Sequence, residues 1–70
     1  MSGVYANFPN KLEKLLERKK VNVKQVAEET GIGATTLFEW KSGKYFPTIK
    51  NLEKLANYFG VSVNYFLRED

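Results

Sequence analysis

Residues 23–42 decide the fold of this 70-residue chain, and they read VKQVAEETGIGATTLFEWKS. Apolar residues recur at helical spacing on both sides of Gly31, which predicts two short helices joined at that glycine. The tight turn between them needs a positive φ angle, which glycine adopts at little steric cost. Ala27 supplies a small side chain where the two helices cross. The second helix is expected to be held against the core by four apolar residues: Val26, Ile32, Leu37 and Trp40.

Helices are also predicted before and after this stretch. The first begins after Asn7 or Phe8, with Pro9 in its first turn, where the missing N–H costs nothing. Its apolar stripe consists of Phe8, Leu12, Leu15 and Leu16. The rest of its surface is expected to be cationic, with Lys11, Lys14, Arg18, Lys19 and Lys20. Asn22 is the expected N-cap of the second helix, and Gly31 ends it.

Two more helices are predicted after a loop from Ser42 to Pro47. Thr48 caps the first of them, and Gly60 ends it. Its expected core stripe is Ile49, Leu52, Leu55, Ala56 and Phe59. Ser62 caps the last helix, which carries Val63, Phe66 and Leu67. The sequence thus predicts an all-α fold of five short helices over residues 8–67, with an N-terminal arm at 1–7 and a polar tail at 68–70.

Composition excludes several classes of protein. The chain has no cysteine and no histidine, which excludes a zinc finger, a thiol nucleophile, a Ser-His-Asp triad and a disulfide framework. It also has no metal-ligand set and no phosphate-cradling glycine loop, so we expect neither an enzyme nor a cofactor. The apolar runs are too short to cross a membrane. The missing cysteine fits a reducing compartment.

The charge of the chain is uneven. Residues 1–50 hold nine basic and five acidic side chains, a net charge of +4, whereas residues 51–70 hold two basic and three acidic, a net charge of −1. A basic body beside a near-neutral C-terminal part suggests one face for a polyanion and another for a different partner.

The pattern of residues 8–67 resembles the lambda-repressor/Cro type of bacterial and phage regulators. The resemblance rests on the helix pair at 23–42, on Trp40-Lys41-Ser42-Gly43-Lys44 followed by Pro47, and on the closing residues 59–63, Phe-Gly-Val-Ser-Val. It implies a five-helix bundle whose third helix enters the DNA major groove. It also implies a homodimer on a palindromic operator. The resemblance thus predicts a sequence-specific transcriptional regulator, expected to be a repressor, and it places the protein in the bacterial cytoplasm, at the nucleoid.

The sequence departs from this family at three positions. The family often has a glutamine that touches a phosphate at the first position of the second helix, where this chain has Val23. Many members also pair an arginine late in the first helix with a glutamate after the third, and the matching residues here are Leu16 and Lys41. Since both partners differ, no buried charge is left alone. We expect Leu16 to join the core and Lys41 to point outward.

Base contacts are expected from the side of the third helix opposite Leu37 and Trp40. Because a helix turns about 100° per residue, Thr35 and Glu39 point away from the core. The candidate base-contacting residues, which the resemblance also implies except for Phe38, are Gly33, Ala34, Thr35, Phe38 and Glu39. A glutamate can accept a hydrogen bond from cytosine, and alanine, threonine and phenylalanine side chains can contact the methyl group of thymine. Apolar contacts and DNA shape are thus expected to contribute as much as hydrogen bonds.

Phosphate contacts are expected on both sides of the third helix, from the start of the second helix and from the loop before the fourth. The candidates are Asn22, Lys24, Thr36, Ser42, Lys44, Tyr45 and Lys50. A dimer interface is expected in the near-neutral C-terminal part, at Tyr58, Asn64, Tyr65 and Phe66. Two linked modules hold DNA more tightly than one.

Each of these assignments has an alternative. Glu39, Thr35 and Thr36 are also typical of an ordinary solvated helix face, and the C-terminal aromatic residues are also typical of a small core. The basic run Arg18-Lys19-Lys20 fits a solvated helix end, and Trp40 fits the core better than a stacking platform. Phe38 also fits the core or a protein contact, so a protein-interaction module such as an antitoxin or adaptor is the alternative function.

Overall fold

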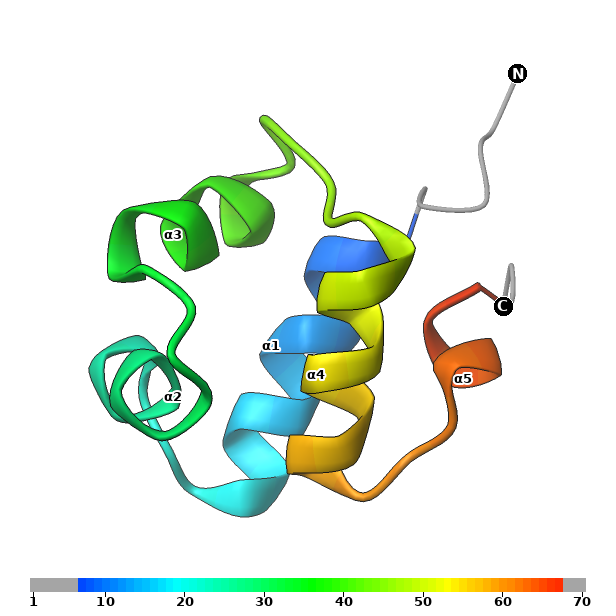
Figure 1. Cartoon of the computed structure of the whole chain (residues 1–70), viewed down its shortest axis with the longest axis horizontal. Coiled ribbons are helices and arrows are strands. Elements are labelled where there is room, and N and C mark those ends of the chain that lie inside the picture. Colours follow the sequence, from blue (N-terminus) through cyan, green and yellow to red (C-terminus); the bar gives the residue numbers. More distant parts are fainter. Residues whose placement is uncertain (1–6, 68–70) are drawn as a thin grey trace.

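The computed structural model describes residues 7–67, which fold into five helices (Figure 1). They are α1 (Phe8–Lys19), α2 (Val23–Thr30), α3 (Ala34–Ser42), α4 (Ile49–Phe59) and α5 (Val63–Leu67). The described residues contain no strand, so the predicted all-α fold is confirmed for this part of the chain. The predicted arm, apart from Asn7, and the predicted tail lie outside the described residues.

The helix ends follow from local chemistry. Asn22 begins α2 because its Oδ1 accepts the backbone N–H of Gln25 at 2.8 Å, and Thr48 Oγ1 does the same for Asn51 at 3.3 Å at the start of α4. Gly31 ends α2 with φ of 82°. α1 is the exception, because it ends at Lys20, which adopts the same left-handed conformation at φ of 61° without being glycine.

Side chains from all five helices form the core, in which Phe8 contacts several elements. The Phe8 ring is fully buried, and its centroid lies 6.4 Å from that of Trp40, 5.5 Å from that of Phe66 and 6.3 Å from that of Phe46. One residue of α1 therefore joins α3, α5 and the loop between α3 and α4. The buried cluster also contains the following side chains: Leu12, Leu15, Leu16, Val23, Val26, Ile32, Leu37, Leu52, Leu55 and Ala56.

The helix packing leaves one side of α3 uncovered. α1 packs against α3 and α5, α2 packs against α3 and α4, and α4 packs against α5. α2 and α3 lie together at one end of the molecule, apart from α5 (Figure 1). Since α3 is held by α1 and α2 on its inner side, its outer side faces solvent.

Three expectations about single residues were wrong. Lys11 was placed on the cationic surface of α1, yet it is 7% exposed, and its Nζ donates to the Tyr65 carbonyl at 2.9 Å. It follows Phe8 by three residues and precedes Leu15 by four, so it shares their stripe, and its long stem crosses to α5. Ile49 was placed in the core but is exposed, because it begins α4 ahead of the turn that contacts the core. Ser42 belongs to α3 and not to the loop.

Candidate nucleic-acid interface

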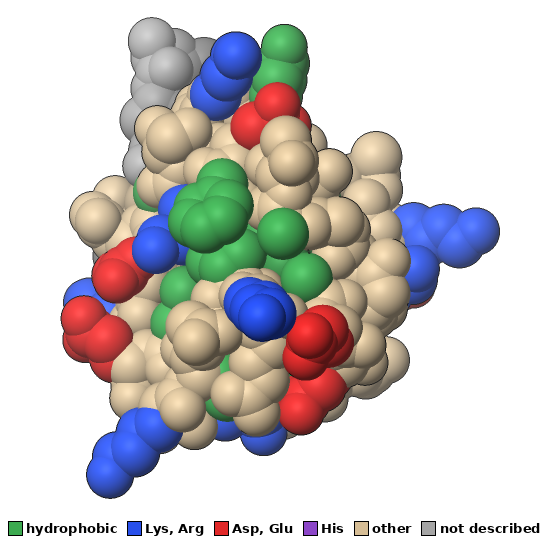
Figure 2. All heavy atoms as spheres, turned by 90° about the vertical axis from the view of Figure 1, so that its left-hand side faces the viewer, with side chains coloured by type: hydrophobic (Ala, Val, Ile, Leu, Met, Phe, Trp, Pro, Cys, Tyr) green, Lys and Arg blue, Asp and Glu red, His purple; other side chains and the backbone are tan. Residues whose placement is uncertain are grey.

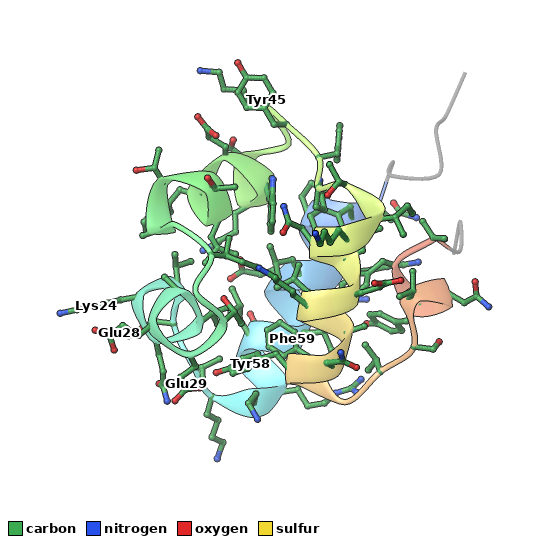
Figure 3. All side chains as sticks on the ribbon, viewed as in Figure 1. Lys24, Glu28, Glu29, Tyr45, Tyr58 and Phe59 are labelled. Atoms are coloured by element: carbon green, nitrogen blue, oxygen red, sulfur yellow. The ribbon has the colours of Figure 1, made fainter. Side chains whose placement is uncertain are left out.

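The start of α2 presents the first group of predicted contact residues. Asn22 and Lys24 are both exposed, and Figure 3 shows Lys24 pointing away from the body of the molecule beside Glu28. The Oδ1 atom of Asn22 is taken by the helix cap, which leaves its amide NH₂ as the group that can donate to a phosphate. Val23 is buried, so the first residue of α2 contributes packing and no polar group to this surface.

The side chain of Thr30, for which the sequence predicted no special role, fixes the turn between α2 and α3. The Thr30 hydroxyl donates to the Val26 carbonyl at 2.7 Å and accepts the backbone N–H of Ile32 at 3.1 Å. Ile32 is buried, which holds the turn against the core. Together with the positive φ of Gly31, these contacts set the direction in which α3 leaves the turn. The position of Thr30 at the end of a predicted helix could have indicated this role in the sequence.

The two sides of α3 differ as the helical spacing predicts. Leu37 and Trp40 are buried. The exposed residues on the outer side are Gly33, Ala34, Thr35 and Phe38, while Thr36 and Glu39 are half-buried. Apolar side chains gather on this end of the molecule with charged side chains around them (Figure 2). Among residues 7–67, no side chain pairs with the Glu39 carboxylate, and its backbone carbonyl accepts from Ser42 Oγ and from the Lys44 amide.

The loop after α3 presents the second group of predicted contact residues. Ser42 Oγ also accepts the backbone N–H of Lys44 at 3.3 Å, which folds the loop back over the end of α3. Tyr45 is exposed and projects from the loop (Figure 3), and Lys44 Nζ lies 5.6 Å from its ring centroid. Lys50 is exposed in the first turn of α4. Donors from this loop and from the start of α2 therefore lie before and after the exposed side of α3 in the chain.

Lys41 does not point freely outward, which corrects the expectation. Its Nζ lies 3.3 Å from Glu13 Oε1 and 6.0 Å from the Phe38 ring centroid. Leu16 is buried as predicted. Many family members pair an arginine at the Leu16 position with a glutamate at the Lys41 position. In this chain the acidic partner, Glu13, is on α1, three residues before Leu16, and the basic partner is Lys41. Both side chains are partly exposed, so the pair orients Lys41 more than it stabilises the fold.

An open groove of about 470 Å³ lies beside α3, where the end of α1 meets the start of α2. Its apolar wall includes Leu16, Val23 and Phe38. Charged side chains of both signs complete the lining: Glu13, Glu17, Lys20, Lys24 and Lys41. The groove joins the predicted base-contacting side of α3 to the predicted phosphate-contacting start of α2.

The predicted dimer residues are used partly inside the chain. Phe66 is fully buried and belongs to the core, which is the alternative for these aromatic residues. Tyr65 is half-buried beneath Lys11, and Asn64 is exposed. Tyr58 donates from its OH to Glu29 Oε1 at 2.5 Å and so joins α4 to α2 (Figure 3). The exposed surface around α5 is thus narrower than the sequence suggested.

The contact between Tyr58 and Glu29 changes the pKa of both groups. The hydrogen bond from Tyr58, followed by one from Gln25, lowers the pKa of the Glu29 carboxyl below its ordinary value of 4.5. Partial burial, followed by the hydrogen bond to Glu29, raises the pKa of Tyr58 to about 12. Lys19 Nζ lies 5.0 Å above the Tyr58 ring and adds a favourable charge near Glu29. This cluster fixes α2 at the end farther from the groove.

Neither a metal site nor a membrane span is found in the described residues. Within residues 7–67, no group of three or more His, Cys, Asp or Glu side chains is placed to hold a metal ion. None of the described helices is long and apolar enough to cross a membrane.

Comparisons with known proteins match this arrangement. The profile of the helix-turn-helix domain family matches residues 10–69. The HTH-type transcriptional activator BcrR of Enterococcus faecalis is 30% identical over 60 residues, which are 86% of this chain and 29% of that protein. The cryptic phage CTXphi transcriptional repressor RstR of Vibrio cholerae is 30% identical over 56 residues, 80% of this chain and 50% of that protein.

A third relative is an HTH-type transcriptional regulator of Haemophilus influenzae, 32% identical over 59 residues, which are 84% of this chain and 24% of that protein. The chain therefore spans half or less of the length of these relatives. No solved structure matches it significantly.

Proposed function

Because the chain belongs to the helix-turn-helix domain family, we propose that it is a DNA-binding transcriptional regulator whose α3 enters the major groove of a palindromic operator. The observation that carries the proposal is the uncovered outer side of α3. It is exposed from Gly33 to Thr35 and again at Phe38, while Leu37 and Trp40 fix the inner side in the core. A helix held in this way presents its side chains to a groove without further rearrangement.

The proposed phosphate contacts come from both sides of α3. Asn22 and Lys24 contact the backbone at the start of α2, and Lys44, Tyr45 and Lys50 contact it after α3. Thr36 and Ser42 are polar residues of α3 itself with the same proposed role. Such contacts set the position and orientation of α3, while the proposed base-reading residues are Gly33, Ala34, Thr35, Phe38 and Glu39.

The regulator is proposed to act as a homodimer. A palindromic operator matches the two-fold symmetry of a dimer, and linking two modules raises the effective concentration of the second one. Asn64 and the exposed part of Tyr65 are the proposed contacts on α5, with Tyr58 on α4. Repression is the proposed outcome of operator binding, in line with the name of RstR. Because BcrR is named an activator, a reporter gene fused to the promoter should be used to measure whether transcription falls or rises.

A selection of random-sequence DNA with the purified chain tests the proposal directly. The selection is run at about 50 mM and about 200 mM salt, because phosphate contacts lose affinity steeply over this range. The expected result is a palindrome whose half-sites are centred about one helical turn apart. Thr35→Ala and Glu39→Ala are then expected to change the recovered bases. The proposal fails if no motif is recovered at either salt concentration.

A protein-interaction module is the second candidate, and one observation favours it. Phe38 is 57% exposed and lies beside a half-buried Glu39 whose carboxylate has no partner among residues 7–67. An apolar ring beside a carboxylate fits a protein surface as well as a DNA groove. In this case DNA binding is weak, has no sequence preference and disappears at moderate salt, whereas an antitoxin-like or adaptor-like partner protects Phe38.

A further inference from the structure

We propose that Phe38 reads the C5 methyl group of a thymine in each half-site, so that an apolar contact of α3 decides part of the operator sequence. The inference rests on the proposed DNA-binding function and adds the chemical group that is recognised. It concerns a residue at which the family resemblance implies no base contact.

The Phe38 ring is available for such a contact. It is 57% exposed, more than the other large apolar side chains with open surface, Tyr45, Phe46 and Ile49. Most aromatic residues of residues 7–67 pack ring against ring, as Phe8 does with Trp40, but Phe38, like Tyr45, takes part in no such pair within the described part of the chain. The ring is therefore not placed on the surface by a contact with another ring.

The side chain beside Phe38 is held in place. Lys41 Nζ lies 6.0 Å from the ring centroid and is kept there by Glu13 at 3.3 Å. The ammonium lies over the Phe38 ring, which limits the freedom that the ring loses when it contacts a base. Lys41 lines the same groove as Lys20 and Lys24, and cations favour a polyanionic partner.

The surface around Phe38 is suited to a small apolar group. Figure 2 shows apolar side chains gathered on this face of the molecule, and Phe38 shares the groove wall with Val23. Val23 stands where the family often has glutamine, so an apolar side chain takes the place of an amide at this position of the groove wall. Among base edges in the major groove, the C5 methyl of thymine is the apolar group of the four natural bases.

The other residues of α3 leave few alternatives for reading bases. Residues 33–39 contain no arginine or lysine, which would bind guanine, and no asparagine or glutamine, which would bind adenine. Glu39 is the charged residue of this stretch, and its carboxylate can accept a hydrogen bond from the amino group of cytosine. A thymine contact by Phe38 therefore supplies discrimination that hydrogen bonds from α3 do not.

The experiment uses the operator obtained by DNA selection. Each thymine of one half-site is replaced in turn by uracil, which lacks only the C5 methyl group, and the Kd is measured for the chain and for Phe38→Ala. We expect one replacement to weaken binding about fourfold, the value of one buried methyl group. We expect the same replacement to have little effect on Phe38→Ala. Such a loss of coupling identifies the contact, because general effects on DNA affect both proteins equally.

Two controls make the result specific. Ile49→Ala removes another exposed apolar side chain outside α3, and we expect it to keep the full uracil effect. At the sensitive position, 5-methylcytosine paired with guanine is compared with cytosine paired with guanine. Since the methylated pair restores the methyl group in the major groove, it is expected to bind more tightly with intact Phe38 and equally with Phe38→Ala.

The inference is overturned if no uracil replacement weakens binding, or if the loss is the same in Phe38→Ala as in the unchanged chain. In either case the operator still binds, so the proposed DNA-binding function stands. If no operator is recovered at all, that function fails together with this inference. Phe38 is then expected to contact a protein.

Discussion

Lys11 and Phe38 reverse the usual placement of their residue types, and the two regions around them differ in a way that separates folding from binding. Lysine is rarely buried and a large aromatic side chain is rarely left in solvent. Yet Lys11 is 7% exposed between α1 and α5, while Phe38 is 57% exposed on α3. The buried lysine has partners inside the chain, because its Nζ donates to the Tyr65 carbonyl and lies over the Tyr65 ring.

Phe38 has no comparable set of contacts. The charged group near its ring, Lys41, is itself paired with Glu13. The junction of α1 and α5 is therefore complete within one chain, and the outer side of α3 is not. Substitutions in the first region should change the free energy of unfolding, and substitutions in the second should change binding.

Trp40→Ala should have the largest effect, because it removes the inner anchor of α3. Trp40 is buried and packs edge-to-face against Phe8. Truncation of a buried tryptophan costs about 3–5 kcal/mol, which is most of the stability of a domain of this size. We expect thermal unfolding followed by circular dichroism to lose its cooperative transition. A variant that melts like the unchanged chain would show that α3 is not anchored through this residue.

Lys11→Ala should cost about 1–3 kcal/mol, because the Tyr65 carbonyl loses the ammonium that donates to it. Lys11→Met keeps the apolar stem of the side chain and is expected to lose less stability than Lys11→Ala by burying that stem. Urea unfolding of the two variants measures the difference. Equal stability of Lys11→Ala and the unchanged chain would contradict a structural role for this lysine.

Lys20→Gly should stabilise the chain by about 1 kcal/mol. Lys20 follows the last residue of α1 and has φ of 61°, a left-handed conformation that strains a residue with a Cβ atom. Glycine removes this strain, although it also increases the freedom of the unfolded chain. Urea unfolding is again the measurement. Lys14→Gly serves as the matched control, since Lys14 is an exposed lysine inside α1, where glycine should destabilise the helix.

Tyr58→Phe should have a smaller effect that depends on pH. The pKa of Glu29 is lowered, so the contribution of this contact is present above pH 4.5 and is lost as pH falls through the lowered pKa. The pKa of Tyr58 is raised to about 12, so the contribution is present below pH 10 and is lost as pH rises through about 12. The unchanged chain should exceed Tyr58→Phe in melting temperature at neutral pH.

The difference in melting temperature between these two proteins is expected to narrow as the pH falls below 4.5 and through the lowered pKa of Glu29. Other carboxylates titrate in the same range in both proteins, so only the difference reports on the contact between Tyr58 and Glu29. If the difference in melting temperature stays constant from neutral to acid pH, the stabilising effect of the Tyr58 hydroxyl does not depend on the charge of Glu29, which would contradict this prediction.

Phe38→Ala should have the smallest effect on unfolding, within about 0.5 kcal/mol, because the ring is mostly in solvent. The same variant should bind the selected operator less tightly. The pair of measurements, one of stability and one of affinity, separates the outer side of α3 from the region around Lys11. A large loss of stability in Phe38→Ala would mean that the ring belongs to the core.

Much of this fold could be predicted because local signals and helical spacing agree. Asn22 and Thr48 cap helices where the sequence placed caps, and Gly31 and Gly60 end them. The predicted burial was wrong at Lys11 and Ile49, because tertiary packing decides burial. The long stem of Lys11 crosses to α5, and Ile49 begins α4 outside the core. Helical spacing gives the direction of a side chain but not what lies opposite it.

The candidate site was predictable to a lesser degree. The exposure of Thr35 and Phe38 followed from the burial of Leu37 and Trp40 on the same helix. Contacts between distant residues did not follow, because they depend on how helices cross: the pair of Lys41 with Glu13 and the pair of Tyr58 with Glu29 are examples. The spacing of one helix contains no information on such partners.

The most direct test of the central claim, that the outer side of α3 is the DNA-binding surface, is the change in backbone amide NMR signals when the selected duplex is added to the ¹⁵N-labelled chain. We expect the largest changes in amide chemical shift in residues 33–39, with further changes at the start of α2 and in the loop before α4. Changes confined to α5 and the first turns of α1, with residues 33–39 unaffected, would contradict it.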